Sequence, residues 1–135
     1  MKKIDIACIV DDDPIFVFGA KRIMELSNFC KGFMVFNNGR DALDSLSPLV
    51  ISGENIPDVI LLDLNMPIMD GWQFLDEFIK IKTNKKIVIY IVSSSIDPAD
   101  TEKAKQYQNV SNFIVKPITV DNLKAILKEI TEDNT

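Results

Sequence analysis

Short apolar runs and amphipathic segments alternate along almost the whole chain. Five of these runs have the length and the branched side chains typical of β-strands, and they span Ile4–Val10, Phe33–Phe36, Val59–Leu62, Ile87–Val92 and Phe113–Val115. The third run contains no polar residue, which is typical of a strand covered on both faces of a parallel sheet. The pattern therefore predicts five strands, with the third in the interior of a parallel sheet.

Each apolar run is followed by a segment in which apolar residues recur with helical spacing. Helices are predicted over 15–26, from 39 through 46, and over 71–81, 98–108 and 119–130. In the first of these helices, one broad buried face is expected to include Ile15, Phe16, Phe18 and Leu26. Each predicted helix thus has an apolar face that can cover the sheet.

Local signals mark several helix boundaries. Asp13-Pro14 and Asp97-Pro98 each combine a capping carboxylate with a proline that suits the first helical turn. The turn at 37–39 is expected to cap the second helix. That helix ends either near Ser47-Pro48 or at Ser52-Gly53, and the pattern leaves both possibilities open.

The order of elements is a strand followed by a helix, repeated five times. Crossovers between parallel strands are right-handed, so this order predicts an open, doubly wound parallel sheet with helices on both faces. The sequence contains no internal repeat, low-complexity tract or linker. A single α/β domain over residues 1–135 is therefore expected.

Polar residues gather where the predicted strands end. In an open α/β sheet, ligands bind in the crevice outside the carboxyl ends of the strands. The residues expected at this edge are three acids after the first strand, one after the third, a hydroxyl after the fourth and an ammonium after the fifth: Asp11, Asp12, Asp13, Asp63, Ser93 and Lys116. Carboxylates, a hydroxyl and an ammonium are thus predicted to share one rim.

Two interpretations of these carboxylates remain open from spacing alone. Clustered acids repel one another, and a hard divalent cation such as Mg²⁺ would compensate that repulsion. The alternative is a set of helix caps and turn residues, which is the preferred interpretation of Asp13. With a cation present, Lys116 and Ser93 would contact a phosphoryl group, and Asp63 would be the natural nucleophile.

Composition excludes several classes of function. The chain has 135 residues, 15 Lys plus Arg against 20 Asp plus Glu, and a net charge of -5. It therefore lacks the basic footprint of a nucleic-acid binder, and direct DNA binding is not expected. No apolar run approaches the roughly 18 residues of a membrane span, and the start does not resemble a signal peptide. A cytoplasmic protein with no membrane association is expected.

Histidine is absent from the sequence. Its absence excludes a Ser-His-Asp or Cys-His catalytic pair, a His-ligated zinc site, and a phosphohistidine made by this chain itself. Cys8 and Cys30 form no Cys-x-x-Cys motif, so reduced thiols are expected.

Four motifs in order resemble those of a CheY-like response-regulator receiver domain. They are Val-Asp-Asp-Asp-Pro at 10–14, Leu-Asp-Leu-Asn-Met-Pro at 62–67 with Met-Asp-Gly at 69–71, Val-Ser-Ser at 92–94, and Phe-Ile-Val-Lys-Pro at 113–117. The resemblance covers nearly the whole chain. It implies a flavodoxin-like sheet with strand order 2-1-3-4-5 and five flanking helices.

The resemblance also implies a role for each residue of the rim. Asp63 would be the phosphoacceptor. The Mg²⁺ ion, or Mn²⁺ in its place, would be bound directly by Asp12 and Asp63, by the backbone carbonyl of Asn65, and through water by Asp11. Lys116 would contact the phosphoryl oxygens. Ser93 and Phe113 would be the switch residues, and Asn65 and Ser95 are expected to line the path of the hydrolytic water.

Partners follow from the same resemblance. The donor would be a phosphohistidine on a sensor histidine kinase or a histidine phosphotransfer protein. A downstream protein would bind the face formed by the helix at 98–108, the strand at 113–115 and the last helix. The chain after Lys116-Pro117 has room for one helix and a short tail, so no output domain is expected. The link from Leu46 to Ile56 is longer than in the shortest receivers.

Three other functions match parts of the same pattern. A metal-dependent phosphohydrolase with an aspartyl nucleophile is the main alternative, but such enzymes carry a second Asp where this chain has Asn65. A flavin-binding module would place a phosphate beside the acidic turn at 11–13, which would repel it. A receiver that serves only as an interaction scaffold would not need the complete set of motif residues. On these grounds the chain is expected to be a phosphoacceptor that catalyses at most its own phosphorylation and slow dephosphorylation.

Overall fold

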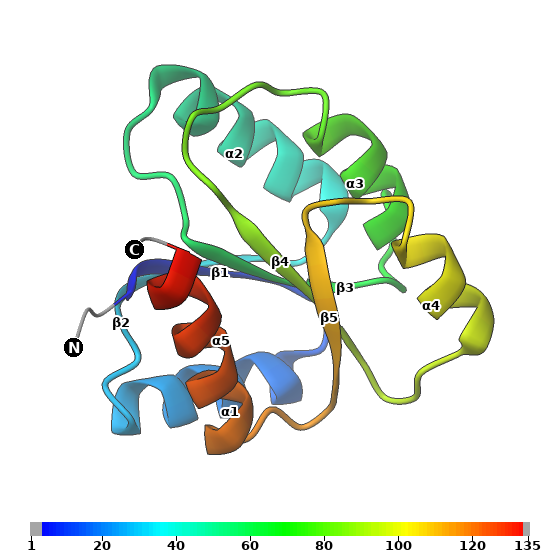
Figure 1. The fold of residues 1–135 in the computed structure, drawn as a ribbon. Helices are drawn as coiled ribbons and strands as arrows, with labels where there is room; N and C mark the ends of the chain where they lie inside the picture. Colours follow the sequence, from blue (N-terminus) through cyan, green and yellow to red (C-terminus); the bar gives the residue numbers. More distant parts are fainter. Residues whose placement is uncertain (1–3, 134–135) are drawn as a thin grey trace.

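The computed structural model describes residues 4–133 and contains one five-stranded sheet (Figure 1). Its strands are β1 (Ile4–Val10), β2 (Cys30–Phe36), β3 (Val59–Asp63), β4 (Val88–Ser93) and β5 (Val110–Val115). All neighbouring strands pair in parallel, in the order β2-β1-β3-β4-β5. The predicted doubly wound sheet and its strand order are confirmed.

Five helices cover the two faces of the sheet. They are α1 (Pro14–Leu26), α2 (Gly39–Ser52), α3 (Gly71–Phe78), α4 (Pro98–Ala104) and α5 (Val120–Asp133). Figure 1 shows α1 and α5 on one side of the sheet and α2, α3 and α4 on the other. Within residues 4–133, no helix is long and apolar enough to cross a bilayer.

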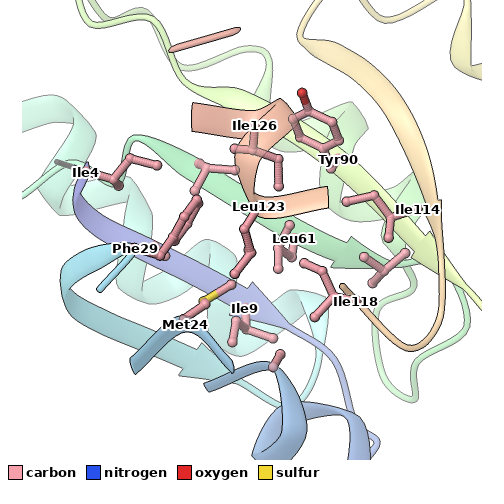
Figure 2. Packing of buried hydrophobic residues seen from close by; sticks show 14 of the residues in the cluster. Ile4, Ile9, Met24, Phe29, Leu61, Tyr90, Ile114, Ile118, Leu123 and Ile126 are labelled. Atoms are coloured by element: carbon pink, nitrogen blue, oxygen red, sulfur yellow. The ribbon is translucent and has the colours of Figure 1, made fainter. Parts of the chain in front are cut away.

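The interior strands supply two separate cores, because successive side chains of a strand point to opposite faces. Every residue of β3 is buried. On one face, Figure 2 shows Met24 of α1 and Leu123 of α5 beside Ile9 and Leu61 of the sheet. The other face packs against α2 and α3 through a second cluster of buried residues that includes Cys8, Ile60, Leu62, Leu46 and Phe74.

The predicted helix starts are confirmed in atomic detail. The Asp13 Oδ1 atom accepts a hydrogen bond of 3.0 Å from the Ile15 N–H, and Asp97 Oδ1 accepts one of 2.8 Å from the Ala99 N–H. The α2 helix is capped by Asn38, whose Oδ1 accepts from the backbone of the next turn. These caps satisfy N–H groups that have no partner within the helix.

The structure resolves the end of α2. The helix continues through Pro48 and ends at Gly53, whose φ of 82° lies in the left-handed region that glycine tolerates. The Gly53 N–H closes the last turn on the Leu49 carbonyl at 2.9 Å. Proline stops many helices, but here the apolar face of α2 on both sides of Pro48 is buried against the sheet, and that packing extends the helix.

Several predicted boundaries were wrong. β2 begins at Cys30 and not at Phe33, and β5 begins at Val110 and not at Phe113. Both strands are lengthened by pairing with a neighbour, β2 with β1 and β5 with β4. α3 and α4 end three and four residues earlier than predicted, at Phe78 and Ala104. Turn hydrogen bonds follow each of these ends.

The predicted buried face of α1 was too broad. Phe16, Ala20 and Met24 are buried, one above another along the helix. The side chains of Ile15, Phe18 and Leu26 are 83%, 73% and 72% exposed. α1 lies beside α5 on one face of the sheet, so only a narrow stripe of it is covered.

Cys8 and Cys30 form no disulfide, in line with the expected reduced state. Cys8 is fully buried in β1, and burial raises the pKa of its thiol well above the usual range. Cys30 is half-buried at the start of β2.

Candidate functional site

Three carboxylates meet at the carboxyl edge of the sheet. Asp11 and Asp12 follow β1, and Asp63 is the last residue of β3. One carboxylate oxygen from each of the three lies within 4.8 Å of the other two. They meet because β1 and β3 are paired neighbours, with Val10 opposite Leu62.

Asp11 is buried and has two differently placed oxygens. Its Oδ1 accepts a hydrogen bond of 2.9 Å from the Asp13 N–H. Its Oδ2 lies 2.9 Å from the Lys116 ammonium, although no donor among residues 4–133 is aligned for a hydrogen bond to it. Burial raises the pKa of Asp11, and this effect is opposed first by the direct contact with the Lys116 ammonium and then by the Asp13 N–H.

Asp63 is also buried, and its surroundings disfavour its charge. Burial and, second, the negative charge of Asp11 raise its pKa to about 6. The Lys116 ammonium and a long hydrogen bond of 3.4 Å from the Asn65 N–H act in the opposite direction. Asp63 is therefore a carboxylate that is ionised at neutral pH at a cost in free energy.

These residues fit a hard divalent cation. The donor set consists of oxygen atoms only, and Asp12 is exposed, which leaves room for water ligands. The Lys116 ammonium lies against one of these three clustered carboxylates, so negative charge remains in excess at the rim and an added cation would compensate it. The observations favour an Mg²⁺ site over a mere set of helix caps for Asp11, Asp12 and Asp63, whereas Asp13 caps α1.

Lys116 links the acid cluster to the ends of β4 and β5. It follows β5, and its N–H donates to the Ser93 carbonyl at 2.8 Å, which ties together the ends of β4 and β5. Its ammonium lies 4.7 Å from the centre of the Phe16 ring. Sequence reasoning assigned Phe16 only to a buried helix face, because nothing local in the sequence indicates that α1 reaches Lys116.

The predicted switch residues are arranged around the same rim. The Ser93 hydroxyl donates to the Ser95 carbonyl at 2.6 Å and accepts from the Ser95 N–H at 3.3 Å. It is thus engaged in a local turn. Phe113 is half-buried and packs against a small cluster formed by Leu64, which follows Asp63, together with Ile91 and Ala104.

The loop between β3 and α3 is closed by a glycine. The Gly71 N–H donates to the Leu64 carbonyl at 3.0 Å. A Cβ atom at Gly71 would lie 2.5 Å from the Asp63 carbonyl oxygen and 2.9 Å from Leu64 Cα, closer than real contacts allow. Gly71 is therefore required for α3 to begin directly beside the acid cluster, a role that the sequence indicated only as a turn.

Ile68, in the same loop, has an unusual backbone conformation. Its φ is 69°, and the Met69 N–H closes a tight turn on the Pro67 carbonyl at 2.7 Å. A positive φ is unfavourable for a β-branched residue. The side chain is 79% exposed, so packing does not compensate this strain.

Comparisons of the sequence and of the structure with known proteins point to one family. A model of the response regulator receiver domain family matches residues 7–128. A solved two-component response regulator from Cytophaga hutchinsonii is 28% identical, with a TM-score of 0.88 over 97% of this chain and 99% of that one.

Two curated relatives are of different lengths. The probable methanogenesis regulatory protein FilR2 of Methanothrix harundinacea is 27% identical over 94% of this chain and 81% of its own length. The transcriptional regulatory protein PrrA of Mycobacterium tuberculosis is 29% identical over 90% of this chain. The chain spans 48% of the length of PrrA.

We expect replacement of Ile68 by glycine to stabilise the protein. Relief of the positive φ exceeds the entropic cost of glycine, so Ile68→Gly should raise the free energy of unfolding by about 1 kcal/mol. Ile51 is a control, because it is similarly exposed but lies in the last turn of α2 with no positive φ to relieve, so glycine there should not stabilise the protein. Urea unfolding of both variants measures the difference. A loss of stability in Ile68→Gly would contradict the inferred strain.

The raised pKa of Asp63 predicts a pH-dependent stability in the presence of a chelator. The folded state holds the Asp63 proton up to pH about 6, whereas the unfolded chain releases it near pH 3.8, so the contribution of Asp63 to wild-type stability falls as the pH rises through this window. Asp63→Asn removes this loss and should be more stable at pH 8 by on the order of 2 kcal/mol. The difference should shrink toward pH 4. Equal pH profiles of the two proteins would refute the raised pKa.

Proposed function

The chain belongs to the response regulator receiver domain family, and from this membership we propose that Asp63 is its phosphoacceptor in two-component signalling. The observation that carries the proposal is the buried Asp63 carboxylate beside Asp11, Asp12 and the Lys116 ammonium. Members of this family are signalling modules and not enzymes that turn over an external substrate.

The proposed reaction is an in-line displacement at phosphorus. An oxygen of the ionised Asp63 carboxylate forms the new P–O bond while the P–N bond of a donor phosphohistidine breaks, and the electron pair stays on the donor imidazole. The 135 residues contain no histidine, so the donor histidine lies outside them, and we assign it to a sensor histidine kinase or a histidine phosphotransfer protein.

The acidic rim needs positive charge for this reaction. Asp12, Asp63 and the Asn65 carbonyl would hold Mg²⁺ or Mn²⁺ directly, and Asp11 would hold it through water. The ion, when bound, neutralises charge on the transferring phosphoryl oxygens. Lys116 is placed to add a second positive charge, since its ammonium already lies against Asp11.

The phosphorylated state would then reorganise the α4-β5-α5 face. In our proposal the Ser93 hydroxyl leaves its turn with Ser95 to donate to the phosphoryl group, and Phe113 turns inward. Phe113 packs on the cluster that contains Leu64 and Ala104, so the acceptor strand and α4 share its contacts. This coupling supports the proposed switch.

The same face offers a surface for a downstream protein. The exposed apolar side chains of this part of the molecule are Ile96 before α4, Val115 in β5 and Val120 in α5.

Asn65 and Ser95, each two residues beyond Asp63 or Ser93, are exposed. We assign them to tuning the access of water to the acyl phosphate.

We expect Asp63→Asn to abolish phosphorylation. Incubation of the wild type with a small phosphodonor and Mg²⁺ should add one phosphoryl group by intact mass, and the variant should gain none because the amide is not a nucleophile. Asp13→Asn is the control, since that neighbouring acid caps α1 and should leave the mass gain intact. Equal phosphorylation of Asp63→Asn and wild type would disprove the assignment.

Metal dependence should separate Asp12 from Asp13. Asp12→Ala removes a proposed direct ligand and should slow phosphorylation at fixed Mg²⁺ by about tenfold or more. Asp13→Ala should cost about 1 kcal/mol of stability through the lost cap but change the rate little. The measurement is a Mg²⁺ titration of the initial rate. Equal rate losses in both variants would refute the ligand assignment.

The switch should be visible with a beryllofluoride mimic of the phosphoryl group. Amide exchange should change from about Ser93 to Gln108 and near Phe113. Trp72 is the single tryptophan and stacks on Tyr107 at 5.5 Å beneath the Lys103 ammonium, so its fluorescence should change as α4 moves. Changes confined to α1 and α2 would contradict the proposed output face.

A further inference from the structure

The Lys116 ammonium lies over the face of a buried aromatic ring. Its Nζ is 4.7 Å from the centre of the Phe16 ring, the shortest of the three cation–π contacts found in residues 4–133. The Phe16 side chain is 6% exposed and that of Lys116 is 15% exposed. Water is therefore largely excluded from the contact, which strengthens the attraction between a cation and a ring.

The other restraints on this ammonium leave its position under-determined. Its charged partner is Asp11 Oδ2 at 2.9 Å. The Lys116 backbone is anchored on the Ser93 carbonyl, but four rotatable carbons separate the backbone from the charge. A single ion pair at the end of a flexible stem fixes the distance from the ammonium to Asp11 Oδ2 but not the side of that oxygen on which the ammonium lies.

The Phe16 ring, by contrast, is rigidly held. It belongs to the core cluster between the sheet and the helices α1 and α5, which also contains Ala20, Ile114 and Ile118. Ile114 and Ile118 flank Lys116 in the sequence, so the same packing fixes the ring and the chain on both sides of the lysine. The Phe16 ring therefore contacts the Lys116 ammonium from a fixed position.

We infer that Phe16 is a positioning residue for phosphoryl transfer, which holds the desolvated Lys116 ammonium between Asp11 and the acceptor Asp63. The inference rests on the proposed role of Lys116. Through the ring, the lysine is ready to move from the Asp11 carboxylate to the phosphoryl oxygens without first being released to water. Phe16 acts through Lys116 and touches neither the donor nor the phosphoryl group.

A graded change of the ring's charge distribution tests this inference without changing the shape of the core. Replacement of Phe16 by 4-fluoro-, 3,5-difluoro- and 3,4,5-trifluorophenylalanine weakens the negative face of the ring step by step. The logarithm of the phosphorylation rate constant with a small phosphodonor and Mg²⁺ should fall along the series, to about tenfold below wild type. The same series at Phe29, which is buried in the same cluster, should leave the rate within about twofold of wild type.

A readout independent of phosphorylation comes from nuclear magnetic resonance of the protein without phosphodonor. The ring should shift the Lys116 Cε protons upfield, and Phe16→Leu should abolish this shift. Phe29→Leu deletes an equivalent buried ring and should leave the Lys116 signals in place. Unchanged Lys116 signals in Phe16→Leu would overturn the inference.

The kinetic outcomes distinguish the inference from the function on which it rests. A wild-type protein that gains no phosphoryl group on Asp63 refutes the proposed function. A wild type that is phosphorylated, with a flat rate across the fluorinated Phe16 series, refutes the positioning role alone. Equal declines of the phosphorylation rate in the Phe16 and Phe29 series would show that Phe16 acts only through core packing. This result would also overturn the inference.

Discussion

Burial of Asp11 and Asp63 side by side is the constraint on which the rest of the site depends. Burial raises the pKa of both carboxylates, and the negative charge of Asp11 raises that of Asp63 further. The Lys116 ammonium compensates part of this charge from the end of β5. The remaining imbalance makes the rim suited to a divalent cation and to the transfer of a phosphoryl group, whose own charge needs the same compensation.

The close packing of the sheet centre keeps the two buried carboxylates together despite their repulsion. β3 is buried along its whole length, so Asp63 stands at the end of a strand that cannot yield to the repulsion. Gly71 brings α3 within contact distance of the same strand end. Around this fixed centre, the hydroxyl of Ser93 is held by a local turn, and Ile68 is exposed in a strained one. A phosphorylation switch requires acids that stay in place, such as Asp11 and Asp63, beside groups that can change conformation, such as the Ser93 hydroxyl.

Much of the fold was predictable because its signals are local. Apolar runs of strand length, helical spacing and the Asp-Pro caps depend on residues close in sequence, and they yielded the five strands and the five helices, whereas the strand order came from the resemblance. The starts of β2 and β5 were missed, since pairing with β1 and β4 extends them beyond their apolar runs. The exposure of Ile15 and Phe18 was missed because the width of the buried face depends on how α1 packs beside α5.

The sequence by itself placed the acids, Ser93 and Lys116 at one rim, because the carboxyl ends of parallel strands share one edge of the sheet. Only the tertiary structure decided how these groups meet. The unaligned Oδ2 of Asp11, the raised pKa of Asp63 and the Phe16 ring under Lys116 arise from contacts between segments far apart in the chain. No local pattern encodes such contacts, since they exist only once β1, β3 and β5 have been brought together with α1.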